Sequence, residues 1–348
     1  MTILQTQKEE KELPADSVEE NQQDEDGLSE QEIPQDPSED QDKSDESLPA
    51  EKVSEPSAEI QATKVSSGSC GPNTTYTIYD DNSIVISGSG PMDDFTWDTT
   101  MPWLSYRQTL QTVRVENGIT TIGNKAFYCC YNIVSVSLPD TLTSIGKGAF
   151  EACTGLTSIT IPVSVKEFGK FAFAGCNFTS FIVPEGVTTL DGTFNGCDEL
   201  ISVSIPESVT VIDNMAFNGC TSLASIDLPY SLITIGQSVF DGCTSLASID
   251  IPETVETIGN LAFTECVLLT SVYIPEKVTF LGSSAFRDCT SLEAAIFADL
   301  DLKILSSELF KGCTSLKTVK LPDSVRSFNG GVFSGCTALE SIDLPESM

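Results

Sequence analysis

Apolar residues recur with a period of about 23 positions along most of this chain. Two segments show the pattern well: LTSITIPVSVKEFGKFAFAGC covers residues 156–176, and LASIDIPETVETIGNLAFTEC covers residues 246–266. One aromatic position can be followed through ten copies, with gaps of 23, 23, 21, 23, 23, 23, 23, 24 and 23 residues. Its members are Phe127, Phe150, Phe173, Phe194, Phe217, Phe240, Phe263, Phe286, Phe310 and Phe333. A fixed period of this length indicates a solenoid, in which neighbouring coils share a continuous core.

Each copy predicts the same local structure. The S-I-x-I segment alternates outward and inward residues, which indicates a short strand with two side chains in the core, such as Ile159 and Ile161. Proline ends this strand because it cannot donate to a ladder. The S-V-x-x-I-G segment is a turn that returns two apolar residues to the core, and its last position predicts a left-handed backbone. We expect one turn of α- or 3₁₀-helix at A-F-x-x-C. The fold class is therefore an α/β repeat solenoid, a leucine-rich repeat arc of about ten 23-residue repeats over residues 112–348.

The rest of the chain divides into two further parts. Residues 1–65 hold 20 acidic residues, five lysines and five prolines, but no aromatic residue and no cysteine. Such a segment cannot bury enough apolar surface to fold, so we expect it to be disordered. Residues 66–111 are expected to form a small β-rich cap, because the first repeat would otherwise expose its core. The chain stops at LPESM, inside a repeat, which predicts a truncated C-terminal end.

Charge and composition narrow the possible functions. The formal net charge is −33, which argues against nucleic acid as a partner because phosphate binding needs Lys and Arg. The chain has no histidine, so Ser-His-Asp triads, Cys-His dyads and HExxH zinc sites are excluded. No apolar run is long enough to insert into a membrane, and no secretory leader is recognisable. We predict no catalytic residue, no cofactor and no metal ligand.

Ten of the twelve cysteines occupy one repeat position, three residues after each phenylalanine. A buried small residue that packs the core explains all ten at once, and we prefer this interpretation to a disulfide or metal column. Cys70 and Cys129 lie outside the pattern, and a disulfide between them is conceivable. The residue after the repeat proline is acidic in seven of nine copies, with Val163 and Tyr230 as the exceptions. We interpret these acids as a solvated edge, with a calcium ladder as the less favoured alternative.

The outward position of the first strand is the candidate binding face. This column varies from copy to copy, whereas its inward neighbours do not, and such a column can encode a partner. Asp227, Asp250 and Tyr273 are consecutive in it and predict an acidic patch beside an aromatic anchor. The candidate partner-binding residues are Thr160, Ser204, Asp227, Asp250, Tyr273 and Lys320. The alternative is that they are ordinary soluble strand residues.

The repeat pattern P-x-S-V-x-x-I-G-x-x-A-F-x-x-C-x-x-L closely resembles the BspA-like class of leucine-rich repeats. The run CGPNTTYTIYDDNSIVISGSGPMDDF, which begins at Cys70, is similar to the segment that caps such repeats. The resemblance implies a non-catalytic protein that binds a protein ligand, as a bacterial cell-surface adhesin or a host- or matrix-interaction protein, at the cell surface or secreted. The alternative function is an intracellular leucine-rich repeat scaffold, which the unpaired thiols favour. No sequence feature favours an enzyme.

Overall fold

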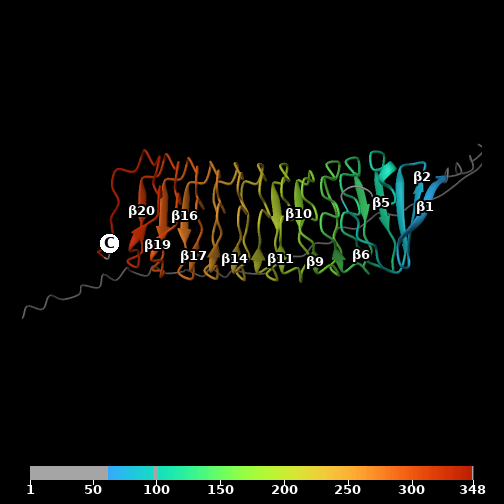
Figure 1. The fold of residues 1–348 in the computed structure, drawn as a ribbon, viewed down its shortest axis with the longest axis horizontal. Coiled ribbons are helices and arrows are strands. Elements are labelled where there is room, and N and C mark those ends of the chain that lie inside the picture. The colour runs from blue at the N-terminus through green and yellow to red at the C-terminus, as the bar shows by residue number, and fades with distance from the viewer. Residues whose placement is uncertain (1–61, 97–100, 347) are drawn as a thin grey trace, which may run out of the picture. The chain divides into compact units, whose positions relative to one another are not determined.

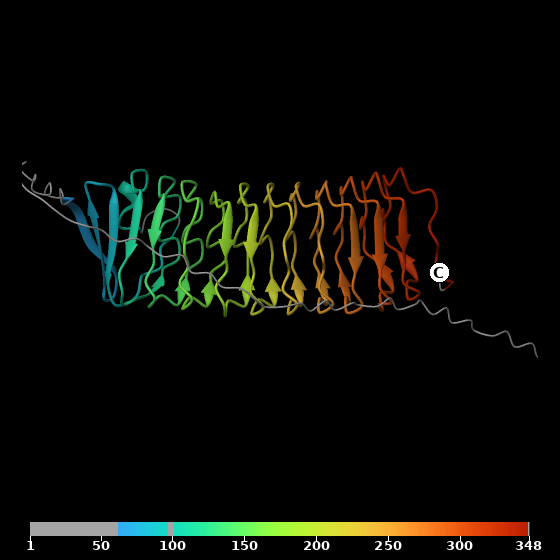
Figure 2. The ribbon, with the colours of Figure 1, turned by 180° about the vertical axis from the view of Figure 1, so that it is seen from behind.

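The computed structural model describes residues 62–96, 101–346 and 348. In the folded unit, coils follow one another in chain order and stand side by side, as Figures 1 and 2 show from opposite sides. The predicted disordered segment, residues 1–65, lies outside the described residues except for its last four. Strand β1 (Lys64–Gly71) begins two residues before the expected start of the cap at residue 66.

Three antiparallel strands form the N-terminal end of this unit. β1, β2 (Thr74–Tyr79) and β3 (Ser83–Gly88) pair in chain order. β3 then pairs in parallel with β5 (Thr112–Val115), which is the first strand of the repeats. The antiparallel sheet thus continues directly into the parallel strands of the solenoid.

Trp103 extends the core of the repeats into this N-terminal region. Its side chain is fully buried and donates its Nε1–H to the carbonyl of Ala126 at 2.9 Å. Its ring stacks on Phe127 with 5.6 Å between the centroids. Because Trp103 occupies the space that a preceding phenylalanine would fill, the first repeat has a packed neighbour on both sides.

The repeats form two columns of parallel strands, one from the S-I-x-I segments and one from the segments just before the glycine. After β5, the first column contains β7 (Ser135–Ser137), β10 (Ser180–Ile182), β12 (Ser202–Ser204), β16 (Ser271–Ile274), β18 (Ala294–Phe297) and β20 (Thr318–Lys320). The second column contains β4 (Gly90–Pro91), β6 (Ile119–Ile122), β8 (Ser144–Ile145), β9 (Glu167–Phe168), β11 (Thr189–Leu190), β13 (Val211–Ile212), β14 (Thr234–Ile235), β15 (Thr257–Ile258), β17 (Phe280–Leu281), β19 (Ile304–Leu305) and β21 (Ser327–Phe328). Paired residues of consecutive coils occupy equivalent repeat positions, such as Tyr273 with Ile296.

The first column is not continuous. Residues 157–161 form no strand, and their inward side chains Ile159 and Ile161 are partly buried against the core. Residues 224–228 and 247–251 also form no strand, although their inward side chains are buried, and they separate the sheet β10–β12 from the sheet β16–β18–β20. The S-I-x-I pattern therefore predicted the direction of the side chains correctly, but not the backbone pairing in every copy.

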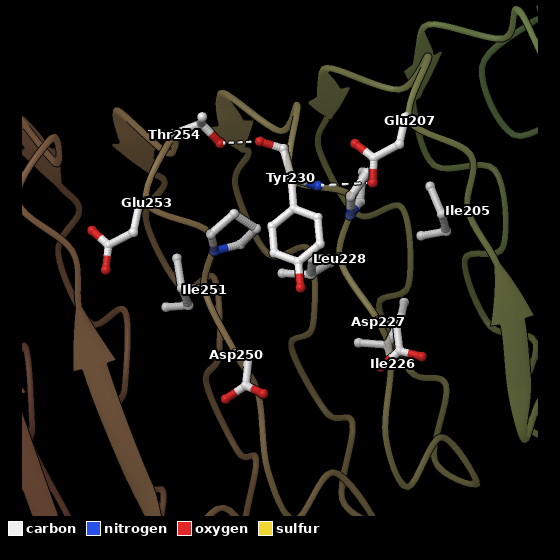
Figure 3. A pocket seen from close by; sticks show the side chains of 12 residues that line it. Ile205, Glu207, Ile226, Asp227, Leu228, Tyr230, Asp250, Ile251, Glu253 and Thr254 are labelled. Atoms are coloured by element: carbon white, nitrogen blue, oxygen red, sulfur yellow. Dashed lines mark hydrogen bonds between the residues drawn. The ribbon is translucent and has the colours of Figure 1, made fainter.

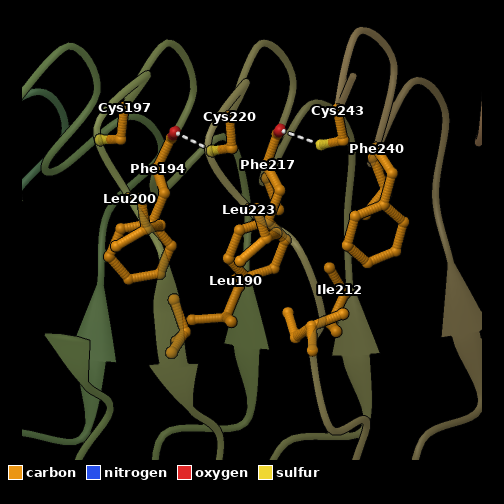
Figure 4. Packing of buried hydrophobic residues seen from close by; sticks show 14 of the residues in the cluster. Leu190, Phe194, Cys197, Leu200, Ile212, Phe217, Cys220, Leu223, Phe240 and Cys243 are labelled. Carbon is orange, nitrogen blue, oxygen red and sulfur yellow. Dashed lines mark hydrogen bonds between the residues drawn. The ribbon is translucent and has the colours of Figure 1, made fainter. Parts of the chain in front are cut away.

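The core is a ladder of aromatic rings and thiols that repeats with the coils (Figure 4). Successive phenylalanine rings stack, for example Phe217 on Phe240 at 5.5 Å between centroids and an interplanar angle of 3°. In nine coils the cysteine Sγ–H donates to the phenylalanine carbonyl of the preceding coil, with Sγ···O distances of 3.0–3.3 Å. The cysteine is thus a small buried residue that also satisfies a buried carbonyl, which a plain hydrophobe could not do.

All twelve cysteines are free thiols, so the conceived disulfide between Cys70 and Cys129 is not formed. Cys70 instead lies 3.6 Å from the hydroxyl of Thr74, measured from Sγ to Oγ1. Burial raises the pKa of Cys130, Cys197 and Cys243 to about 12. These thiols are therefore inert components of the core rather than reactive groups.

The expected helix at A-F-x-x-C is wrong, and the described residues contain a single helical turn, the 3₁₀ helix η1 (Leu104–Tyr106). The residue just before the Ala-Phe pair is left-handed in most coils, as at Ser238 (φ 53°) and Leu261 (φ 58°). The residue just before the cysteine is also left-handed, as at Gly242 (φ 74°). Left-handed residues at both ends prevent a helix from propagating. The amides instead bond to the next coil, as Phe217 N does to Val239 O at 2.9 Å. The solenoid is thus mostly strand and turn, not α/β.

The glycine of S-V-x-x-I-G is explained by close packing rather than by a left-handed backbone. Gly236 and Gly259 have no positive φ. A Cβ on Gly259 would lie 2.5 Å from the carbonyl carbon of Gly236 in the preceding coil. The side chain is therefore excluded because two backbones approach each other.

One coil departs from the regular stack. The interval between Phe173 and Phe194 is 21 residues, two shorter than usual. No direct stacking joins these rings; Phe181 lies between them, with centroids 5.2 Å from Phe173 and 4.7 Å from Phe194. Phe178 and Phe181 replace the Leu and Ile of other copies, so larger side chains compensate for the shortened coil.

Candidate interaction face

The six predicted binding residues, Thr160, Ser204, Asp227, Asp250, Tyr273 and Lys320, are all exposed. Strand pairing places Tyr273 beside Ile296 and Ile296 beside Lys320. Ser204 pairs with Ile182. Thr160 lies several coils from the acidic pair, so the six residues form a line along the solenoid rather than one compact site.

A cleft of about 590 Å³ lies where the first column has no strand pairing. Its lining residues are Ile205, Glu207, residues 226–230 and residues 250–254. Three consecutive coils thus contribute to it, and it contains two of the predicted residues, Asp227 and Asp250. We call this hollow the Tyr230 cleft.

Tyr230 is the residue that sequence reasoning missed. It is 81% exposed, although its backbone is held firmly between two coils. Its amide donates to Glu207 Oε1 at 3.2 Å, and its carbonyl accepts from Thr254 Oγ1 at 2.7 Å. Figure 3 shows the ring standing in the cleft, with its hydroxyl directed toward the end where Asp227 and Asp250 lie. The available signal was its departure from the acidic residues that follow most repeat prolines.

The electrostatic environment of the cleft is negative throughout. Glu207, Asp227, Asp250 and Glu253 line it, and no Lys or Arg does. Residues 171–276 contain 13 acidic residues and no Lys, Arg or His. Within the described residues, the ion pairs lie on either side of this span or at its edge, such as Lys170–Asp191 and Lys311–Glu308. The acidic groups of the cleft therefore have no internal cation to neutralise them.

The described residues contain no group of three or more His, Cys, Asp or Glu side chains placed to hold a metal ion. The repeat thiols are nearly all buried, with raised pKa values. Among the described residues there is also no helix long and apolar enough to cross a membrane.

The stacked coils, the two strand columns and the shared hydrophobic ladder define a leucine-rich repeat solenoid. Such solenoids are generally protein-interaction scaffolds that present an extended surface. The BspA type leucine rich repeat region matches residues 104–193, 191–313 and 291–348, in six copies. The chain therefore belongs to the family of BspA-type leucine-rich repeat proteins, as its repeat pattern predicted.

Solved structures support the same fold. A leucine-rich repeat protein from Eubacterium ventriosum is 26% identical, with a TM-score of 0.58, and the match covers 82% of this chain and 92% of that one. A leucine-rich repeat protein from Bacteroides ovatus is 27% identical, with a TM-score of 0.59 and coverage of 78% and 81%. No curated protein matches the chain.

Proposed function

We propose that this chain is a non-catalytic module that binds a protein ligand at a bacterial cell surface. The supporting observation is the contrast between a repetitive interior and a first-strand column whose outward residues differ from coil to coil. That column includes an exposed tyrosine and two carboxylates in consecutive coils, Asp227, Asp250 and Tyr273. Aromatic residues in such positions are enriched among binding hot spots. The surface location rests on what the resemblance to the BspA-like class implies.

A second candidate is an intracellular scaffold with the same fold. The observation that favours it is the set of twelve free thiols, because reducing compartments preserve unpaired cysteines. Burial weakens this argument, since the thiols are protected from oxidants in either compartment. We therefore rank the surface location first.

The binding face can be tested with one variant and a matched control. The variant Asp227→Lys, Asp250→Lys, Tyr273→Ala changes the first column. The control Glu199→Lys, Glu256→Lys, Phe280→Ala makes the same exchanges at exposed residues outside that column. The variant should fail to capture a protein ligand from extracts of host cells or matrix, and the control should capture it. Equal capture by both would overturn the assignment of this face.

The location is tested by surface proteolysis of intact source cells, followed by peptide mass spectrometry. Release of peptides from residues 66–348 without lysis is the expected result. Peptides that appear only after lysis would favour the intracellular scaffold.

A further inference from the structure

We infer that the Tyr230 cleft binds an extended, arginine-bearing segment of a partner protein, with a guanidinium over the Tyr230 ring and carboxylates on either side. This inference rests on the proposed function and deepens it, because it states which part of the face binds and what the partner must carry.

The cleft is deep enough for a side chain and apolar at its floor. Leu228 and Ile251 point inward from two neighbouring coils and are largely buried, but they still border the hollow. Pro229 and Pro252 line the same wall, and neither has an amide to offer a ligand. An aliphatic stem therefore fits the floor, while any polar head must find its partners at the rim.

The carboxylates at the rim of the cleft determine that the polar group of the ligand must be positively charged. None of Asp227, Asp250 and Glu253 has an ion pair or a side-chain hydrogen bond to another described residue. These three carboxylates are therefore available to bind a cationic ligand. The 13 acidic residues of the surrounding span add a negative field that attracts cationic segments and repels acidic ones.

Tyr230 favours arginine over lysine. Its backbone is fixed by hydrogen bonds to Glu207 and Thr254, so only the side-chain torsions of the exposed ring remain to be ordered when a ligand binds. A planar guanidinium stacks on an aromatic face and can bond a carboxylate with its remaining donors, whereas an ammonium does so less well. Tyr273, two coils further along the chain than Tyr230, extends the face for the rest of the segment.

The experiment measures binding of fluorescein-labelled extended peptides to the full chain by fluorescence anisotropy. One peptide alternates Gly and Arg, a second Gly and Lys, and a third Gly and Glu. We expect the Arg peptide to bind most tightly, the Lys peptide more weakly and the Glu peptide not at all. Added salt should weaken binding of both basic peptides.

Variants then separate the cleft from the general field. Tyr230→Ala should weaken the Arg peptide about two- to fivefold, and Tyr230→Phe should retain binding because the ring face remains. Asp227→Asn with Asp250→Asn should weaken it about tenfold. The charge-matched control, Glu199→Gln with Glu256→Gln, lies outside the cleft and should change affinity less than about twofold.

Several results would overturn the inference. They are absence of Arg-peptide binding, no effect of Tyr230→Ala, or equal weakening by the two carboxamide pairs, which would mean a diffuse field without a site. Urea denaturation of each variant excludes misfolding as the cause. If a captured partner is lost on Tyr273→Ala while no basic peptide binds, the proposed function stands and the Tyr230 cleft does not.

Discussion

The buried ladder and the exposed first-strand column run along the same coils but follow opposite rules. In the ladder, Phe217, Phe240 and Phe263 have the same neighbours, the same stacking and the same thiol contact one coil later. In the exposed column, the equivalent positions are Ser204, Asp227, Asp250 and Tyr273. The comparison shows that the core contacts repeat from coil to coil, whereas the charged and aromatic side chains of the exposed column are concentrated in a few coils.

The largest predicted effect is a loss of stability in alkaline solution. A thiol is neutral when protonated, and burial raises the folded pKa of Cys130, Cys197 and Cys243 from 9.0 to about 12. Below about pH 9 both states keep the proton and stability is complete; it is lost as pH rises toward 12, because only the unfolded thiol ionises easily. At pH 10 each of these thiols lowers the free energy of unfolding by roughly 1 kcal/mol, and the three together lower it by several kcal/mol.

Urea denaturation at pH 7 and pH 10, under reducing conditions, measures this loss. The variant Cys197→Ala, Cys243→Ala should be less stable at pH 7 but should lose less between the two pH values. An equal alkaline loss in the variant and the parent chain would show that the ladder thiols are not responsible.

Deletion of one ladder ring should give the next largest effect. Phe240 is fully buried and stacks on a ring in each adjacent coil. Phe240→Ala should lower the free energy of unfolding by about 3–5 kcal/mol, because it leaves a cavity that rigid coils cannot close. Urea denaturation checks this value. A loss below about 1 kcal/mol would mean that Phe240 does not occupy a tightly packed core position, which would contradict the assigned repeat register.

The short coil predicts a smaller effect that depends on its context. Phe181 fills the space between Phe173 and Phe194, where two residues of the repeat are missing. Phe181→Ile restores the residue that other copies carry, yet it should cost about 1–2 kcal/mol because the local volume is no longer filled. Ile249→Val in a regular coil serves as a control for a general loss of apolar volume. Stabilisation by Phe181→Ile would contradict the compensation.

The exposed column should show the smallest effect on stability. Asp227→Asn with Asp250→Asn removes two exposed charges that have no ion-pair partner among the described residues. The expected change is within about 0.5 kcal/mol, and relief of repulsion should make it slightly stabilising. The melting temperature checks this. A large destabilisation would place these carboxylates in the architecture and remove them from the binding face.

The repeat arithmetic was sufficient to predict the solenoid, the inward residues and the location of the irregular coil. The number of coils follows from the repeat length. The Phe and Cys of each repeat are buried because each coil must cover its apolar side with the neighbouring coils. The same arithmetic placed Asp227, Asp250 and Tyr273 on the outside, where the structure has them. These are consequences of alternation and period, which depend on local sequence.

Three features required the tertiary structure. The A-F-x-x-C segment is a turn rather than a helix because its amides bond to the next coil, and a single copy offers no sign of that partner. The glycine before it is set by the approach of a neighbouring backbone, not by its own φ. The Tyr230 cleft is formed by three coils at a break in strand pairing, so its residues converge only after stacking. The sequence by itself determined what repeats and which way it faces; contacts between coils decided the turn, the glycine and the cleft, because hydrogen bonding and close packing there act between residues about 23 positions apart.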